Sequence, residues 1–502
     1  MTTPRHLISD MNYAPAHTSL SIASLGSNRS QDQVFDSRKD ITQVDHSRRL
    51  PPEMLCEIFL QSLPNNRLDE YDEYVSQALR VTHVCATWRS LGIASPPMWT
   101  HLRFVAYSAR ESEVAEAWLI RSGNHPLTFT VEPSSAAFNL AATQAAWENL
   151  LVPQCNRWKD ATLFLWEPIP DKITSQLANN LPLLESLSLS APFDLEIFQG
   201  FHVAPELRRV SLQAMGGIQE SQLPWNGLTS LDIGKVYAIE CFCVLRHLPK
   251  LVTLKIKFSW NPSQVTGEDT PHIQLAFLTD IEIDTAEDSF QLALFWDHFT
   301  FPSLNHLRLL GTWANDVGCA KFTSMLLRSS TTSPLTSLVL DVGSPLELQD
   351  VKKEHLPHIL RSASNIKNLT LAGLMYGQVG DANVVETLMI SQPMCLVPDL
   401  ENLALCSDSS IPFAFGNGNL LVNMIESRRK LGALQSVHVT GLAHLDPLLE
   451  NFDPSSLTKL ETFAADGLLT MDGISHLHPP SKPPVELILT SRLRPGKWSM
   501  AF

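Results

Sequence analysis

The hexapeptide LNHLRL at residues 304–309 has leucine at its first, fourth and sixth positions. The same six-residue kernel, with Ile or Val in place of some leucines, occurs ten times. Its copies lie at residues 184–189, 207–212, 228–233, 251–256, 278–283, 304–309, 335–340, 366–371, 400–405 and 434–439. Successive copies start 21 to 34 residues apart, and apolar residues at helical spacing occur between them. The kernel therefore predicts repeated units, each a short strand followed by a helix or an irregular return.

The alternation of side chains along a strand predicts which kernel residues point away from the core. Successive side chains of a strand point to opposite faces, so the third and fifth positions face away from the buried fourth and sixth. The third-position column reads Ser186, Arg209, Ser230, Thr253, Asp280, His306, Ser337, Asn368, Asn402 and Ser436. The fifth-position column reads Ser188, Ser211, Asp232, Lys255, Glu282, Arg308, Val339, Thr370, Ala404 and His438. The third-position column is wholly polar, which supports this register.

Charges of alternating sign occupy the fifth position on four neighbouring strands, at Asp232, Lys255, Glu282 and Arg308. Two interpretations stay open. The charges form a ladder of exposed ion pairs, each worth less than ~1 kcal/mol, or they belong to a partner-binding surface. In the second case the candidate target-binding residues on the concave face are these four together with Arg209 and His306.

One such unit cannot cover its own leucines, so neighbouring units stack and share a continuous core. This arrangement resembles a leucine-rich-repeat solenoid. The copies lack the Asn or Cys that closes each turn in many such families, and their length drifts, so we expect an irregular α/β solenoid over residues 181–490. Residues 105–180 are either a linking region or degenerate first repeats, and kernel-like fragments at residues 99–104, 127–131 and 163–165 favour the latter.

A different pattern precedes the repeats. The stretch LPPEMLCEIFL at residues 50–60 predicts a helix, because prolines and Glu53 suit a first turn and Met54, Leu55, Ile58 and Phe59 form an apolar face. Residues 64–73 predict an acidic loop, and a second helical block runs through Leu79 to Trp88. Three short helices cannot hide this much apolar surface, so we expect the segment to dock on a partner.

Residues 49–104 resemble an F-box, a small all-α module. The resemblance rests on Leu50-Pro51-x-Glu53, Ile58-Phe59, Leu79, Val84-Cys85-x-x-Trp88-Arg89 and Pro97-x-Trp99-x-x-Leu102. The long loop is similar to that of the F-box proteins with degenerate leucine-rich regions abundant in mushroom-forming fungi. The resemblance implies binding to the Skp-type adaptor of a cullin-RING ubiquitin ligase. The adaptor-binding residues it implies, as contacts or as support, are Leu50, Pro51, Glu53, Ile58, Phe59, Val84, Cys85 and Trp88.

The resulting hypothesis is a non-catalytic substrate-recognition subunit of a Skp–cullin–F-box ubiquitin ligase, whose solenoid binds an unknown protein target. The alternative is a protein-binding scaffold that acts outside a ligase. An enzyme with an unrecognised site is a third hypothesis, and it would need clustered acids and bases in a pocket. We expect no catalytic residues, no cofactor and no metal site. Cys241-x-Cys243 has the wrong spacing for zinc, and alternation predicts a buried or half-buried pair on one face of a strand.

Composition sets the remaining expectations. The 502 residues carry 37 Lys and Arg against 52 Asp and Glu, a net charge of −15, which argues against a nucleic-acid partner. No apolar run is long enough to span a membrane, and residues 1–10 lack a signal-peptide pattern. Eight scattered cysteines favour a reduced cytoplasmic or nuclear location. The polar residues 1–48 predict a disordered leader, and residues 491–502 a C-terminal tail.

Overall fold

The computed structural model describes the following parts of the chain: residues 50–64, 71–105, 109–132, 147–165, 171–191, 198–213, 218, 222–259, 271–285, 289–311, 316–329, 335–341, 352, 354–373, 380–390, 395–406, 419–440 and 453–471. The chain divides into two units, Met1–Pro51 and Pro52–Phe502. Of the first unit, only Leu50 and Pro51 are described. The predicted disordered leader and the predicted tail lie outside the described residues.

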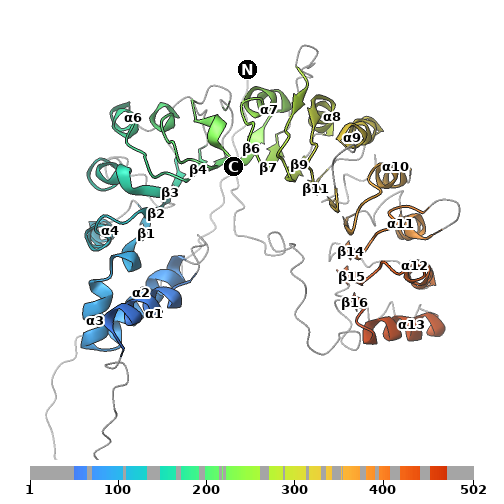
Figure 1. Cartoon of the computed structure of the whole chain (residues 1–502), viewed down its shortest axis with the longest axis horizontal. Helices are drawn as coiled ribbons and strands as arrows, with labels where there is room; N and C mark the ends of the chain where they lie inside the picture. The colour runs from blue at the N-terminus through green and yellow to red at the C-terminus, as the bar shows by residue number, and fades with distance from the viewer. Residues whose placement is uncertain are drawn as a thin grey trace, which may run out of the picture. The chain divides into compact units, whose positions relative to one another are not determined.

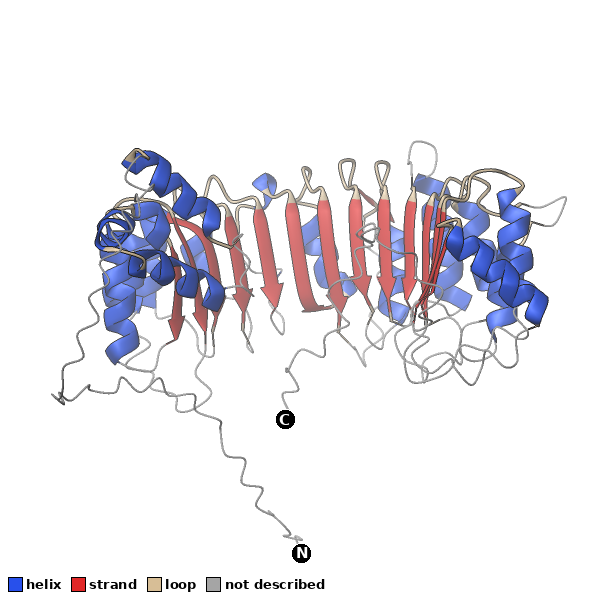
Figure 2. Ribbon diagram, turned by 90° about the horizontal axis from the view of Figure 1, so that it is seen from below, coloured by secondary structure: helices blue, strands red, loops and turns tan. Residues whose placement is uncertain are grey.

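A single parallel sheet organises the second unit, and within the described residues it contains 14 strands. The strands pair in chain order, apart from two short ones that form a separate pair (Figure 2). The strands of the large sheet are β1 (His101–Val105), β2 (Leu127–Glu132), β3 (Trp158–Phe164), β4 (Ser186–Ser190), β5 (Arg209–Gln213), β6 (Ser230–Val236), β7 (Thr253–Phe258), β9 (Asp280–Asp284), β11 (His306–Leu310), β12 (Ser337–Asp341), β13 (Asn368–Ala372), β14 (Asn402–Cys406), β15 (Ser436–Thr440) and β16 (Leu469–Met471). The separate pair is β8 (Ile273–Gln274) with β10 (Phe299–Thr300). The predicted α/β class with short parallel strands is confirmed.

Strand pairing follows the kernel positions. Leu307 of β11 pairs with Ile281 of β9 on one side and with Leu338 of β12 on the other, so fourth positions meet fourth positions. The same alignment holds from β4 to β15, and the predicted register is confirmed. Strands β1 to β3 belong to the same sheet, so the boundary expected between residues 180 and 181 coincides with no break in it.

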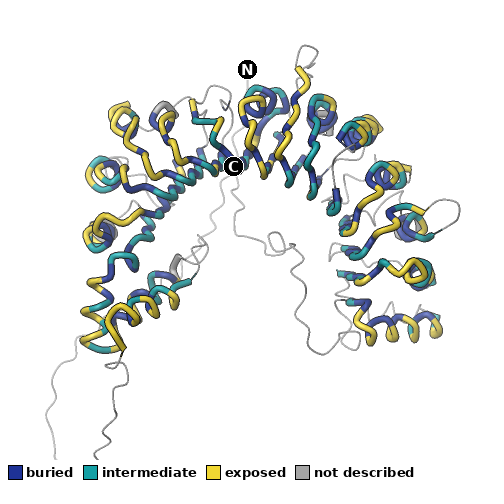
Figure 3. The backbone as a smooth tube through the Cα atoms, viewed as in Figure 1, coloured by how far each residue is buried: buried dark blue, intermediate teal, exposed yellow. Residues whose placement is uncertain are grey.

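Helices cover the outer side of the curved sheet (Figure 1). They are α4 (Ala109–Arg121), α6 (Asp171–Leu177), α7 (Ala238–Leu245), α8 (Ser289–His298), α9 (Asp316–Ser329), α10 (His355–Ser362), α11 (Gly380–Leu388), α12 (Asn419–Arg429) and α13 (Pro454–Ala465), with shorter turns η4 (Trp147–Leu151), η5 (Val152–Arg157), η6 (Phe198–Phe201) and η8 (Trp225–Gly227). Their inward faces and the kernel side chains form one continuous core (Figure 3). Burial of that shared core is the main driving force for stacking the units.

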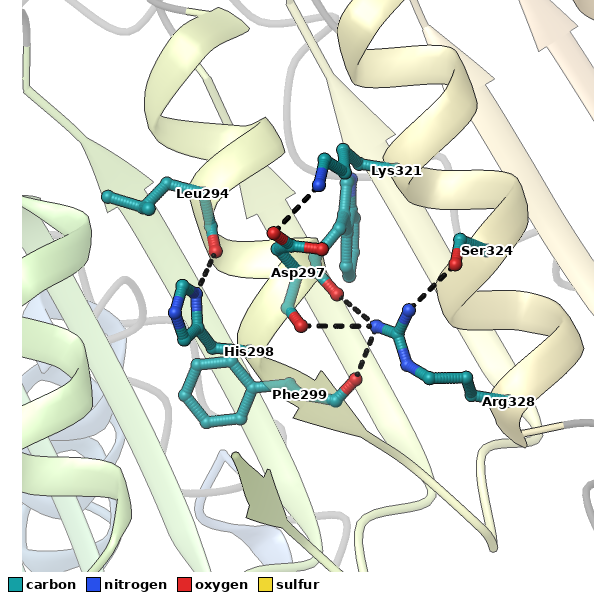
Figure 4. A network of polar contacts seen from close by, with 8 residues as sticks. Leu294, Asp297, His298, Phe299, Lys321, Ser324 and Arg328 are labelled. Atoms are coloured by element: carbon teal, nitrogen blue, oxygen red, sulfur yellow. Dashed lines mark hydrogen bonds and ion pairs between the residues drawn. The ribbon is translucent and has the colours of Figure 1, made fainter. Parts of the chain in front are cut away.

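The half-buried Arg328 and the buried Arg428 connect neighbouring units through hydrogen bonds to backbone carbonyls. In Figure 4, Arg328 of α9 donates to the carbonyl oxygen of Trp296 at 2.6 Å and to that of Phe299 at 3.3 Å, on the unit before it. Arg428 of α12 likewise donates hydrogen bonds to the carbonyl oxygens of Leu388, Leu396 and Val397. These guanidinium groups satisfy carbonyls at helix ends and in returns, which would otherwise lack partners.

The expectation for Cys241 and Cys243 is wrong in one respect, because both lie on helix α7 and not on a strand. Residues 238, 241, 242 and 245 are all buried, and this spacing is that of a helix. Glu240 also accepts a hydrogen bond from the Tyr237 N–H at 3.0 Å, which caps the first turn. Cys241 is buried as expected and Cys243 is half-buried. No helix in the described part of the chain is long and apolar enough to cross a bilayer.

Candidate protein-interaction surfaces

The segment before the sheet contains α1 (Pro52–Ser62), α2 (Tyr71–His83), α3 (Ala86–Ile93) and the turn η3 (Pro96–Trp99). Leu55 and Phe59 are the buried side chains of α1. The Phe59 ring packs against Trp88 of α3 with centroids 4.9 Å apart. Phe59 and Trp88 therefore stabilise the interior of this helical segment. A residue that contacts a partner protein directly would instead have to be exposed.

The structure corrects the predicted second helical block, which is two helices. Helix α2 begins at Tyr71, so the end of the predicted acidic loop is helical; residues 65–70 of that loop lie outside the described residues. The chain leaves the helix after His83, and Cys85 is extended, with φ −156° and ψ 173°. Its Sγ accepts a hydrogen bond from the Trp88 N–H at 3.4 Å and caps α3. Sequence periodicity missed the break because the apolar spacing continues across it.

The helical segment is fixed to the beginning of the sheet by aromatic side chains. The Trp99 indole N–H donates to the Gly92 carbonyl at 2.9 Å, and the Tyr74 hydroxyl donates to the Met98 carbonyl at 3.1 Å. Tyr74 also packs against His101 of β1 with ring centroids 4.7 Å apart. At Gly92 an added Cβ would lie 3.0 Å from the Thr82 Cγ2, so a larger residue would require the Thr82 side chain to shift by a few tenths of an ångström.

Large apolar side chains remain exposed on this segment, at Met54, Ile58, Leu79, Val84 and Ile93. Leu50, Pro51 and Glu53 are exposed as well. The sequence predicted one apolar face for α1, but the structure divides it: Leu55 and Phe59 are buried, whereas Met54 and Ile58 face solvent. Of the predicted adaptor-binding residues, Leu50, Pro51, Glu53, Ile58 and Val84 are exposed, Cys85 and Trp88 are half-buried, and Phe59 is buried. Sequence reasoning did not assign Met54, Leu79 and Ile93 to the binding surface.

The second surface is the inner face of the sheet, where the predicted charged column is continuous. Asp232, Lys255, Glu282 and Arg308 lie side by side on adjacent strands. Glu282 Oε2 is 3.6 Å from Lys255 Nζ and 3.9 Å from Arg308 Nη1. The ion pairs of the first interpretation are thus present, and such pairs on a partly exposed face stabilise a fold by less than ~1 kcal/mol each.

Asp232 is held by its own sheet. The Ser211 hydroxyl and the Gln213 amide each donate to its carboxylate at 3.3 Å. Burial nevertheless raises the pKa of this carboxyl, while neighbouring Lys255 acts in the opposite direction. Gln213 occupies the space beside Gly234, where a Cβ would overlap its amide. Asp232 is therefore less accessible to a partner than the sequence suggested.

Arg209 and His306, the other two predicted target-binding residues, are exposed on β5 and β11. Arg209 Nη2 is 3.0 Å from Asp160 of β3, a pairing that skips the intervening strand. His306 contacts the amide of Asn305 through Nε2 at 3.1 Å. The six predicted residues thus share one face of the sheet. Arg209 lies on β5, the strand next to Asp232, two positions before Ser211, which is the register partner of Asp232.

Beyond β11 the inner face changes character. Its central column continues with Val339, Thr370, Ala404 and His438, which carry no fixed charge. Beside it the Asn402 amide donates to Asn368 at 2.8 Å, and the Ser436 hydroxyl donates to Asn402 at 2.6 Å. The central column over β12–β15 thus lacks the alternating charges of β6–β11, although the acidic Asp341 lies two positions after Val339 on the same face of β12.

Among the described residues, no group of three or more His, Cys, Asp or Glu side chains is placed to hold a metal ion. Burial raises the pKa of the Cys241 thiol and brings that of Cys319 to about 11, so these sulfurs stay protonated near neutral pH. The arrangement is suited to binding another protein by apolar contact on the helical segment and by polar contact on the sheet.

Neither a scan against protein-family models nor a search of curated proteins finds a match to this chain.

Proposed function

We propose that this protein is the substrate-recognition subunit of a Skp–cullin–F-box ubiquitin ligase. Residues 49–104 act as the F-box and bind a Skp-type adaptor, and the leucine-rich-repeat solenoid binds a protein target. The observation that carries the proposal is the set of exposed apolar side chains on a helical segment with the order Leu50-Pro51-x-Glu53 … Val84-Cys85-x-x-Trp88-Arg89.

Apolar side chains that are exposed on the helical segment can stabilise a complex when a partner buries them. Burying one Val, Leu, Ile or Met side chain stabilises a complex by about 1.5–3 kcal/mol before the costs of association. Met54, Ile58, Leu79 and Val84 are all available for such burial. A few apolar anchors of this kind typically dominate the affinity of helix-based interfaces. Phe59 and Trp88 contribute indirectly, because their packing sets the angle between α1 and α3.

The proposed role requires no bond chemistry from this chain. A receptor that holds a target beside a conjugating enzyme raises the effective concentration of the target's lysines. The helical segment is attached to the next part of the chain by packing of Tyr74 on His101 of β1 and of Trp99 on Trp118 of α4, which suits this role. This attachment makes the adaptor-binding end and the start of the sheet move as one body.

A binding experiment with a matched pair of variants tests adaptor binding. Val84 is 61% exposed on the helical segment, and Val317 is 59% exposed on α9. The full chain, Val84→Glu, Val317→Glu and the double variant Leu50→Ala/Pro51→Ala are each titrated against purified Skp-type adaptor. We expect Val84→Glu and the double variant to lose binding, and Val317→Glu to retain it.

No binding by the folded wild-type chain would overturn the assignment of the F-box. Equal loss in Val84→Glu and Val317→Glu would show that the charge, and not its position, disturbs the protein. The alternative function, a scaffold outside a ligase, predicts adaptor binding without target turnover. Comparing the half-lives of co-purified partners with and without the protein distinguishes the two functions.

A further inference from the structure

A small pocket lies at the edge of the sheet where the strands begin, formed by two successive units. The turn before β5 contributes Pro205 and Leu207, the turn before β6 contributes Leu223, Pro224 and Trp225, and His247 follows helix α7. Short turns make up this edge, seen at the top of Figure 2. The pocket is therefore built by the repeat itself and is separate from both surfaces described above.

The size and walls of the pocket restrict what it can bind. Its volume is about 290 Å³, just below the range of ~300–1,000 Å³ typical of small-molecule sites. Proline, leucine and tryptophan form most of its lining, and Asn226 and His247 are the polar side chains among the lining residues. A pocket of this size and character suits one large apolar side chain.

Basic residues lie on the turns that contribute to the pocket, although the protein as a whole carries a net charge of −15. Arg208 donates to the Pro205 carbonyl at 2.9 Å and lies against Gly227, where an added Cβ would be 3.1 Å from its Nη1. Arg246 and Lys250 are exposed on the turn that follows α7. Glu206, 3.2 Å from Arg208, is the one acidic side chain on the turn before β5.

Exposed apolar side chains extend the edge on both sides of the pocket. Val203 directly precedes the pocket residue Ala204, and Val252 follows Lys250 at the start of the next strand. The Val252 N–H donates to the Thr229 carbonyl at 2.8 Å, and the Thr229 N–H donates to the Arg208 carbonyl at 2.9 Å. This row of hydrogen bonds places Arg208 and Val252 on the same edge, two units apart.

We propose that this edge binds an acidic segment of a partner protein, which inserts one large apolar side chain between Pro205 and Trp225. Arg208, Arg246 and Lys250 attract the flanking carboxylates, and the apolar pocket provides the anchor. Charge complementarity favours an acidic occupant, because Arg208, Arg246 and Lys250 would repel a basic segment. The inference does not depend on adaptor binding.

Three labelled peptides of equal length test the proposal by fluorescence anisotropy with the full chain. One has a central Phe between Asp and Glu residues, the second has Ser in place of Phe, and the third has Lys and Arg in place of the acids. We expect the acidic Phe peptide to bind about tenfold more tightly than either of the others. Its affinity should fall as salt rises from 0.05 to 0.5 M, because the charges at the rim are screened.

Two variants locate the site. Lys250→Glu reverses an exposed charge on the turn that contributes His247 to the pocket, and Lys430→Glu reverses an exposed charge on the corresponding turn after α12. We expect Lys250→Glu to weaken the acidic Phe peptide about fivefold, the scale of one exposed charge pair, and Lys430→Glu to leave it unchanged. Trp225→Ala should remove the preference for Phe over Ser, with a thermal melt to confirm folding.

Equal affinity of the Phe and Ser peptides for the wild-type chain would overturn the proposal, because binding would then need no pocket. An equal effect of Lys250→Glu and Lys430→Glu would overturn it too, since the attraction would belong to no particular edge. Absence of binding at millimolar peptide would have the same meaning. None of these results bears on adaptor binding, which uses different residues.

Discussion

The indole of Trp99 packs edge-on against that of Trp118, with ring centroids 4.9 Å apart and planes at 86°. Trp99 ends the helical segment, and Trp118 lies on α4 behind the first strands of the sheet. The Arg121 guanidinium covers the Trp99 ring at 4.6 Å. The two parts of the second unit therefore share a core, and the helical segment is stabilised by the sheet that follows it.

Trp99→Ala is expected to destabilise the protein by about 3–5 kcal/mol, because it removes a fully buried indole and leaves a cavity. Phe277→Ala is the control: its ring is 61% exposed, and we expect a change within about 0.5 kcal/mol. Urea unfolding followed by tryptophan fluorescence measures both. Similar losses for the two variants would contradict the shared core.

The lowered pKa of His101 predicts that the folded protein loses stability in mild acid. Burial lowers its pKa from 6.5 to about 4, although nearby Asp160 opposes the shift. The folded pKa lies below the unfolded value, so between these two pH values the unfolded chain binds more protons, and stability falls as pH decreases. The linkage amounts to about 2 kcal/mol between pH 7 and pH 5.

His101→Gln tests this pH dependence, because glutamine does not titrate. Urea unfolding at pH 7 and pH 5 should show a drop in wild type that is about 2 kcal/mol larger than in the variant. If both proteins lose the same stability between these pH values, His101 is not the responsible group.

Arg428 and Arg429 are neighbours with opposite environments, and they offer a matched comparison. Arg428 is 2% exposed, and burial lowers its pKa to about 10; it donates to three carbonyls at 2.7–3.0 Å. Arg429 is half-exposed and forms one ion pair with Asp466 at 3.3 Å.

We expect Arg428→Lys to cost about 2–3 kcal/mol, because one ammonium group cannot reach all three carbonyls. Arg429→Lys should cost less than about 0.5 kcal/mol. Hydrogen exchange should accelerate in β14 and β15 for the first variant alone. Uniform acceleration over all strands would show that the arginine does not act locally.

Arg308→Glu tests the charged column on the inner face. The new carboxylate would lie beside Glu282, its partner in the strand register, and like charges directly opposite each other destabilise a sheet. We expect a loss about 1 kcal/mol greater than that of Arg308→Gln, and a smaller difference in 0.5 M salt. A difference that does not respond to salt would argue against an electrostatic origin.

The sheet from β4 to β15 could be predicted because the positions of the apolar residues in the kernel determine the register of strand pairing. Leucine, isoleucine or valine at the fourth and sixth positions leaves one way to bury each strand, and a shift by one residue would expose them all. Strands β1 to β3 were harder to assign, since Phe129 and Trp158 replace the leucines and their units are irregular. The helical return at Cys241 was misassigned because eight residues hold too few turns to distinguish helix from strand.

The sequence predicted that this segment is helical, but it did not predict which side chains of α1 are buried. The spacing of Met54, Leu55, Ile58 and Phe59 indicated a helix, yet which two would be buried depended on Trp88 of another helix. The pocket beside Trp225 gave no signal in the sequence, because its walls come from turns separated by a whole repeat. Tertiary neighbours decide such features, and the local pattern does not contain them.

The in-register pairing of the strands also bears on how such a chain can change over generations. Each interior strand from β4 to β15 pairs through the same kernel positions with the strand before it and with the strand after it. Any two of these strands could therefore pair with each other in the same register. A duplication or deletion of one whole unit would leave every other pairing intact. The length of the sheet, and with it the spacing between the helical segment and any given strand, can thus be altered in steps of one strand, about 4.8 Å, without redesign of the fold.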